Sequence, residues 1–263
     1  PAEAVADAVL HGTDLECGES YTNLLEAVQK GLITEAQLDI SLKRLLTVRY
    51  RLGLFDTQHK NPYANRPKSL LEAPEHGAHA LDLARQSMVL LSNKKKLLPL
   101  SSKKKYKILL VGPNADNQTT QLGNYNGFPT HNVTLLEALR NEPNVEVVYD
   151  PLTDFTTWKD GTDIDSLMQQ CQDADMILFA GGISPLLEGE QGDAGGNGVE
   201  GFRDGDRTTI ALPKVQTQAM QQLQKMHKPI VFVCMSGSAV SYNWEAEHLS
   251  AVIQAWYGGG GGA

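Results

Sequence analysis

The sequence predicts an α/β fold in which a mostly parallel sheet is sandwiched by helices. From residue 107 onward, short apolar runs recur and end in glycine or polar residues: 107–112, 145–150, 175–182, 229–237 and 251–259. Helical patterns lie between several of these runs, near 133–141, 163–172 and 213–227. Apolar runs of this length that alternate with helices are typical of central strands covered on both faces.

The first part of the chain, residues 1–56, shows a different pattern of helices around one short extended piece at 13–17. Thr34 and Gln37 have the spacing of a capping box, which satisfies free backbone N–H groups where a helix begins. Leucines follow at helical spacing, and Gly53 is expected to end this helix. Two helices around one strand cannot close a core of their own, so this part requires the rest of a larger α/β unit.

Composition excludes several classes of protein. Lys+Arg number 23 and Asp+Glu 31, so the net charge of −8 disfavours nucleic acid and anionic membrane as partners. No apolar run approaches the roughly 20 residues that a membrane helix needs. Cys17, Cys171 and Cys234 are too widely spaced for a disulfide scaffold or a zinc site, and the histidines form no metal-binding motif. We therefore expect no metal.

The most informative loop, at residues 181–193, follows the strand expected at 175–182 and carries Glu188 and Glu190 beside two leucines. In parallel sheets, ligands bind outside the carboxyl ends of the strands, and the loops GPNADN, MSGSA and WYGG should lie at the same edge. Burial and a neighbouring like charge raise the pKa of a carboxyl group, as a general acid requires. A solvated acidic loop has the same spacing, so this signal alone decides nothing.

The glycine-rich stretch that follows, residues 191–210, fits either a mobile flap or a surface insertion. The chain has no phosphate-cradling GxxxxGK[ST] motif, which disfavours a nucleotide-binding module of the flavodoxin type.

Read together, the segments resemble glycoside hydrolase family 3, particularly its β-xylosidase-like branch. The similar segments follow one another in family order: HGTDLECGESYTNLLEAVQKG, ITEAQLDISLKRLLTVRYRLGLFD, ARQSMVLLSN, LLPL, LLVGPNADNQTTQLGNYNGFPTHNVTLLEAL, GGISPLLEGE, GDRTTIALPKVQ, VFVCMSGSAVSYNW and AVIQAWYGG. Nine such segments in the right order are not expected by chance.

This resemblance implies a domain organisation. Residues 1–56 would be the last strand and helices of a TIM-type (β/α)8 barrel, residues 57–83 a linker, and residues 84–263 an α/β sandwich domain truncated at its C-terminus. The chain begins at Pro1 and stops just after a strand-like run, so we expect an internal piece of a longer protein. It would need the missing part of the barrel as its partner.

The resemblance also implies a chemistry. Family members are typically retaining glycosidases in which a barrel aspartate is the nucleophile and a sandwich glutamate is the acid/base. Glu190 matches the acid/base, with Glu188 as the alternative or a substrate contact. Glu16 and Cys17 are candidate substrate-binding residues: Glu16 falls where barrel loops face the sugar, and Cys17 matches a cysteine that in xylosidase-like members can pair with one adjacent to the nucleophile. The SDW- or SDC-like nucleophile motif lies upstream of the similar segments, outside this chain.

We therefore expect an exo-acting β-glycosidase that removes terminal xylose, or glucose or arabinose, from oligosaccharides without any cofactor. The resemblance favours an extracellular or periplasmic location. A sugar-binding or scaffolding fragment without turnover is the alternative, because the nucleophile motif is absent from the chain.

Overall fold

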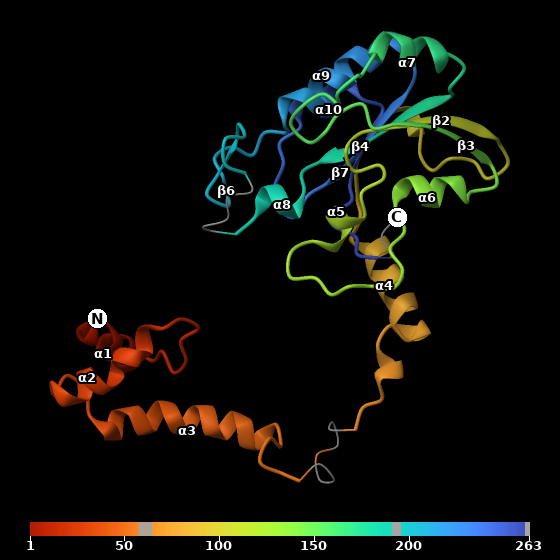
Figure 1. Cartoon of the computed structure of the whole chain (residues 1–263). Coiled ribbons are helices and arrows are strands. Elements are labelled where there is room, and N and C mark those ends of the chain that lie inside the picture. Colours follow the sequence, from red (N-terminus) through yellow and green to blue (C-terminus); the bar gives the residue numbers. More distant parts are fainter. Residues whose placement is uncertain (58–60, 62–64, 191–195, 261–263) are drawn as a thin grey trace. The chain divides into compact units, whose positions relative to one another are not determined.

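The computed structural model describes residues 1–57, 61, 65–190 and 196–260, which form two compact units, Pro1–Leu71 and Glu72–Ala263 (Figure 1). The division between the units falls inside the range 57–83 that the sequence suggested as a linker. Each unit has its own buried residues, and each is described separately below.

The first unit is helical. Its elements are α1 (Ala2–Leu10), a 3-10 turn (Ser20–Asn23), α2 (Leu24–Gln29), α3 (Glu35–Arg51) and a second 3-10 turn (Lys68–Leu70). The expected capping box is confirmed: the Gln37 amide N–H donates to Thr34 Oγ1 over 3.3 Å, and the Thr34 N–H donates to Gln37 Oε1 over 2.9 Å. Gly53 follows α3 with a φ of 72°, as a C-terminal cap requires. The extended piece at 13–17 pairs with no strand among the described residues.

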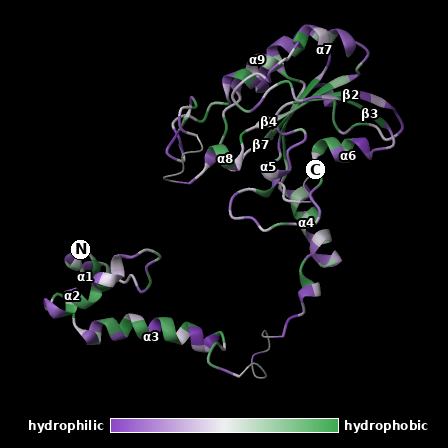
Figure 2. Cartoon of the chain, viewed as in Figure 1, coloured by the Kyte–Doolittle hydropathy of each residue, from purple (hydrophilic) through white to green (hydrophobic). Residues whose placement is uncertain are grey.

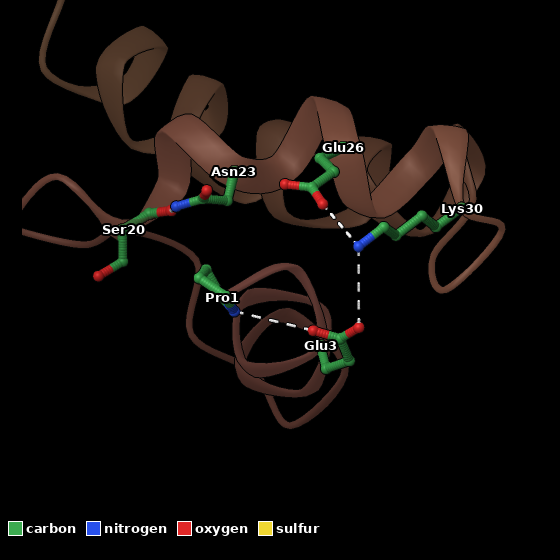
Figure 3. Close-up of polar contacts among 6 residues, drawn as sticks. All are labelled: Pro1, Glu3, Ser20, Asn23, Glu26 and Lys30. Atoms are coloured by element: carbon green, nitrogen blue, oxygen red, sulfur yellow. Dashed lines mark hydrogen bonds and ion pairs between the residues drawn. The ribbon is translucent and has the colours of Figure 1, made fainter.

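The core of the first unit is small. Its buried apolar side chains come from α1, α2 and the turn before α3: Ala2, Val5, Ala6, Val9, Ala27 and Ile33. By contrast, α3 leaves Leu42, Val48 and Tyr50 at least half exposed, and Figure 2 shows hydrophobic residues along much of this helix. The surface of α1 and α2 carries ion pairs, since Lys30 Nζ lies 2.6 Å from Glu26 and 4.0 Å from Glu3 (Figure 3).

The second unit is built on a six-stranded sheet with the order β1-β8-β7-β4-β2-β3. The strands are β1 (Val89–Asn93), β2 (Tyr106–Val111), β3 (Val145–Asp150), β4 (Met176–Gly182), β7 (Ile230–Met235) and β8 (Ala251–Gln254). All neighbouring strands are parallel except β1, which pairs antiparallel with β8 at one edge. The predicted α/β class and the five expected strands are therefore confirmed.

Helices cover both faces of this sheet (Figure 1). α7 (Ile164–Gln170), α9 (Lys214–Leu223) and α10 (Asn243–His248) pack on one face, and α6 (Leu135–Arg140) packs on the other. α4 (Pro74–Ser87) is exposed along most of its length, while α5 (Gln118–Leu122) and α8 (Pro185–Glu188) are short helices in the loops after β2 and β4. Because strand side chains alternate, Ile177 and Phe179 pack toward α7 and α9, while Met176 and Leu178 pack toward α6. Figure 2 shows the central strands as the most hydrophobic part of the unit.

Several elements were not expected from the sequence. The helices α5, α8 and α10 and the two-residue strands β5 (Phe202–Arg203) and β6 (Asp206–Arg207) were not foreseen. The apolar run at 251–259 is a strand only as far as Gln254, because Trp256 has a φ of 59° and leaves the sheet geometry. Among the described residues, no helix combines the length and apolarity that crossing a bilayer requires.

Candidate active site

The loops that carry candidate chemistry follow the carboxyl ends of neighbouring parallel strands. β2 ends at Val111, β4 at Gly182, β7 at Met235 and β8 at Gln254, and their pairings are parallel. Their ends therefore meet at one edge of the sheet, as the sequence predicted (Figure 1). This is the edge at which α/β sheets bind ligands.

The end of β4 is closely packed. Gly182 has a φ of 110°, and a Cβ there would lie 2.0 Å from the carbonyl oxygen of Met235 on β7. Gly112, after β2, has a φ of 104°, and its Cβ would lie 2.3 Å from the carbonyl oxygen of Ala180. Glycine is therefore required at both positions, because a side chain would push neighbouring strands apart.

Two buried amide side chains hold the backbone at this point. Gln216 on α9 accepts from the Gly182 N–H over 2.8 Å and donates to the Gly182 carbonyl over 2.7 Å. Asn114, in the loop after β2, donates to the carbonyls of Gly181 and Ile183 over 3.0 and 3.3 Å. Neither amide side chain is exposed to solvent. The segment that leads into the carboxylate loop is thus fixed from two directions.

The loop then forms the single turn of α8. Ser184 caps this turn, since its Oγ accepts from the Leu187 N–H over 3.3 Å, and Pro185 occupies the first helical position. Gly189 ends the turn with a φ of 56°. Glu188 is therefore the last residue of a capped turn, and Glu190 lies just beyond it.

The carboxylate of Glu188 is anchored by residues from two other loops. The Gly237 N–H, after β7, donates to Glu188 Oε2 over 3.2 Å, and the hydroxyl of Tyr257, after β8, donates to the same oxygen. Burial, and then the hydrogen bond to Glu188, raise the pKa of Tyr257 well above its usual value. The Tyr257 hydroxyl therefore stays protonated and remains a donor to Glu188 at neutral pH.

A half-buried cation lies close to this carboxylate. Arg207, on β6, donates to Ser238 Oγ over 3.2 Å and to the Ala211 carbonyl over 3.0 Å. Burial lowers the pKa of Arg207, while the charge of Glu188 acts in the opposite direction. An open cleft of about 380 Å³ is lined by Glu188, Arg207 and Ser238, among others. The cluster thus combines a carboxylate, a guanidinium and hydroxyl groups at the sheet edge.

Glu190 differs from Glu188 in its surroundings. Its side chain is exposed, whereas that of Glu188 is partly buried. Residues 191–195, the start of the glycine-rich stretch, lie outside the described residues, and both the flap and the surface insertion stay predictions. From residue 196 the chain turns into β5 and β6, with Phe202 buried and Arg207 over its ring at 5.7 Å from the centroid.

Glu16 and Cys17 belong to the first unit and not to the unit that carries the two glutamates. The Glu16 carboxylate accepts from the backbone N–H groups of Ser20 and Tyr21 over 3.3 and 3.2 Å, so it caps the 3-10 turn. Cys17 is an exposed free thiol, while Cys171 and Cys234 are buried, as expected for core residues. Burial raises the pKa of Cys234 to about 12.

Sequence reasoning missed most residues that hold the carboxylate loop. Gly237 and Tyr257 lie in loops that were expected at this edge, but nothing in the sequence singled out their contacts with Glu188. Asn114 and Gln216 were also missed. For Gln216, the available signal was an uncharged polar residue on the apolar face of a helix, next to the buried Val215 and Ala219. Over the part of the chain that the structure describes, no three His, Cys, Asp or Glu residues are grouped as metal ligands.

Comparison with known protein families identifies the family to which this domain is similar. Residues 88–263 match the model of the glycosyl hydrolase family 3 C-terminal domain. The chain belongs to glycosyl hydrolase family 3. The matched range contains the whole six-stranded sheet and the loop of Glu188 and Glu190.

The curated relatives of this chain include xylosidases. The chain is 27% identical to a xylan 1,4-β-xylosidase of Xylanibacter ruminicola, with 96% of the chain and 46% of the relative covered. It is 34% identical to the probable β-D-xylosidase 7 of Arabidopsis thaliana, with 100% of the chain and 33% of the relative covered. The chain therefore spans between a third and a half of the length of these relatives.

Solved structures of glycosidases superpose on the chain. A GH3 exo-β-xylosidase in complex with a xylobiose aziridine probe has a TM-score of 0.83 at 27% identity, covering 99% of the chain and 32% of that structure. A β-glucosidase from Listeria innocua in complex with isofagomine has a TM-score of 0.81 at 27% identity, covering 100% and 35%. A D270A mutant of that β-glucosidase was solved with laminaribiose and has a TM-score of 0.80 at 26% identity, covering 99% and 34%.

Proposed function

We propose that this chain is the acid/base-bearing part of a retaining, exo-acting β-glycosidase that removes terminal β-linked xylose, with glucose as the next candidate sugar. The observation that carries the proposal is the carboxylate loop itself. It lies in the family 3 domain, at the ligand-binding edge of a parallel sheet, with Glu188 tied to Gly237 and Tyr257. Because relatives of the chain are named xylosidases, we place xylose before glucose as the candidate sugar.

In the proposed mechanism, Glu190 is the acid/base. Its side chain is exposed and therefore accessible to a sugar, whereas that of Glu188 is partly buried. Glu190 would donate its proton to the glycosidic oxygen while an aspartate attacks the anomeric carbon, and the bond to the leaving sugar breaks. A water molecule, deprotonated by the same glutamate, would then release the sugar from the aspartate.

The nucleophile would come from a barrel domain that precedes residue 1 in the longer protein. A retaining enzyme holds its two carboxyl groups about 5–5.5 Å apart, so both domains are needed to build the site. Residues Glu16 and Cys17 would lie on a barrel loop that faces the sugar. The 263-residue chain alone is therefore expected to be inactive, and turnover of an aryl β-xyloside by that chain would contradict this division of the carboxylates.

The decisive experiment replaces Glu190 in the longer protein. Glu190→Ala should slow the hydrolysis of xylobiose by about 10²–10⁴-fold, because general acid catalysis contributes roughly that factor. Hydrolysis of 2,4-dinitrophenyl β-xyloside should fall much less in its first step, since this leaving group needs no proton, and azide should partly restore turnover.

Glu188→Ala is the matched control, because it removes a carboxylate from the same loop. If this variant shows the leaving-group dependence and Glu190→Ala does not, the acid/base is Glu188. If neither variant shows it, the acid/base assignment fails. A sugar-binding or scaffolding protein would hydrolyse neither substrate even as the unaltered longer protein.

A further inference from the structure

Gln216 makes contacts that fix the exit of β4. Its Oε1 accepts from the Gly182 N–H and its Nε2 donates to the Gly182 carbonyl, so one side chain pairs with both polar groups of one backbone residue. The Nε2 group also donates to the Phe155 carbonyl over 2.9 Å, which fixes the orientation of the amide. The side chain is completely buried. Gln216 therefore takes the place of a neighbouring strand at this position.

On the β2 side, the sheet provides no strand partner for Gly182. β2 pairs with β4 only as far as Val111 opposite Phe179, while β7 continues beside β4 as far as Met235 opposite Gly182. A buried backbone N–H or carbonyl without a hydrogen-bond partner is costly, so Gly182 needs another partner beyond the end of β2. Gly181 makes room for that partner, because a Cβ on Gly181 would lie 2.4 Å from Gln216 Oε1.

The two consecutive glycines, Gly181 and Gly182, also explain why the backbone at this point needs side-chain hydrogen bonds to fix its direction. Glycine has more backbone freedom than any other residue, so Gly181 and Gly182 alone would let the following loop leave β4 in several directions. The hydrogen bonds from Gln216 select one of them, and Asn114 reinforces it through the carbonyls of Gly181 and Ile183. The chain then passes directly into Ser184 and the capped turn of α8.

We propose that Gln216 is a positioning residue for the acid/base loop: its amide sets the direction in which the backbone leaves β4, and through it the placement of the loop glutamates. This inference rests on the proposed function. Gln216 would touch neither the substrate nor the reacting atoms. Its effect would be to hold the proton donor within reach of the glycosidic oxygen.

The test is Gln216→Met in the longer protein, because methionine keeps the length of the side chain and removes all three hydrogen bonds. The readout is the ratio of kcat/KM for xylobiose to kcat/KM for 2,4-dinitrophenyl β-xyloside, because kcat/KM reports the first step, in which only xylobiose needs the proton. The ratio is expected to fall about 10- to 100-fold, since a displacement of about 1 Å can cost a reaction roughly 10²-fold. The amount of folded enzyme cancels in this ratio, so a loss of stability alone leaves it unchanged.

Thr217→Val is the matched control on the same helix. Thr217 donates to the carboxylate of the buried Glu245 on α10 and makes no described hydrogen bond with β4. The substitution removes a part-buried hydrogen bond, so it should lower stability while leaving the ratio of the two kcat/KM values at the wild-type level.

Gln216→Glu is the second variant and also covers the case in which Gln216→Met does not fold. When protonated, the introduced carboxyl group can donate to the Gly182 carbonyl and accept from the Gly182 N–H; when ionised, it can only accept. Its ratio, relative to wild type at the same pH, should approach 1 at low pH and fall as the pH rises. A wild-type ratio at every pH in the variants that fold overturns the positioning role. An inactive wild-type protein contradicts the proposed function instead.

Discussion

At the scale of single residues, the Tyr257–Glu188 contact has consequences that can be measured without activity. A hydrogen bond to a charged group contributes about 1.5–3 kcal/mol, and the Tyr257 hydroxyl is one of two described donors to Glu188 Oε2. Tyr257→Phe removes only that hydroxyl. We expect it to lower the free energy of unfolding of the second unit by about 1–3 kcal/mol at pH 7, as measured by urea denaturation.

The sign of the pH dependence follows from the pKa of Tyr257, which burial and the hydrogen bond to Glu188 raise in the folded state. A raised pKa means that the contribution is complete below the unfolded value of about 10 and is lost as the pH rises above it. The difference in stability between the wild type and Tyr257→Phe should therefore shrink above about pH 10, by at most roughly 1.4 kcal/mol per pH unit. Tyr125→Phe is the control, since Tyr125 is 89% exposed. A difference that grows with pH would contradict this assignment.

Residue-level reading of the sequence found the carboxylates but not their supports. Glu188 and Glu190 were visible because charged residues stand out after an apolar strand. Gln216 and Tyr257 were not, because a hydrogen bond between residues far apart in the chain depends on the fold. No spacing rule within one sequence joins position 182 to position 216.

At the scale of elements, periodicity was sufficient for the long strands and insufficient for the short helices. The strands β2, β4 and β7 are buried at most or all of their positions, so their apolar runs were clear. α8 has only four residues, less than the length at which a helical period can be recognised. The strand expected at 13–17 did not form, because a strand needs a partner and no neighbouring strand is described in the first unit.

The short helix α8 depends on its cap. Ser184 is buried, and its Oγ accepts from the Leu187 N–H. Ser184→Ala should lower the free energy of unfolding by about 0.5–2 kcal/mol, the usual effect of losing an N-cap. Hydrogen exchange should accelerate at the amides of Leu187 and Glu188 more than in β4.

Ser184→Thr keeps a hydroxyl at the cap and is the matched control, with exchange at these two amides expected near the wild-type rate. Equal acceleration of exchange in α8 and β4 by Ser184→Ala would show that the cap contributes to the whole unit and not to the loop.

At the scale of the whole molecule, the two units differ in how much they bury. The second unit has continuous buried clusters on both faces of its sheet, and every residue of β4 and β7 is buried. The first unit buries a small cluster around α1 and α2, while much of the apolar surface of α3 is exposed. The sequence indicated too few apolar residues in two helices and an extended piece for a closed core, and the need for the rest of a larger α/β unit stays a prediction.

Because each unit has its own buried cluster, we expect the two units to differ in their free energies of local opening. Amide exchange should be slowest in β4 and β7 and faster throughout α1 and α3, because exchange follows the free energy of opening of each cooperative unit. Ile177→Val removes one methylene group from a completely buried position in β4 and should cost about 0.5–1.5 kcal/mol. Its effect on exchange should be confined to the second unit.

The reciprocal variant is Ile33→Val, which removes the same group from a buried position in the first unit. It should accelerate exchange in α1 and α3 while leaving β4 at the wild-type rate, and the two variants together should give additive changes, because the two positions lie in different buried clusters. If Ile33→Val accelerated exchange in β4, the units would open as one. That result would contradict the prediction, because it would mean that the amides of both units are protected by a single cooperative core and not by the separate buried clusters.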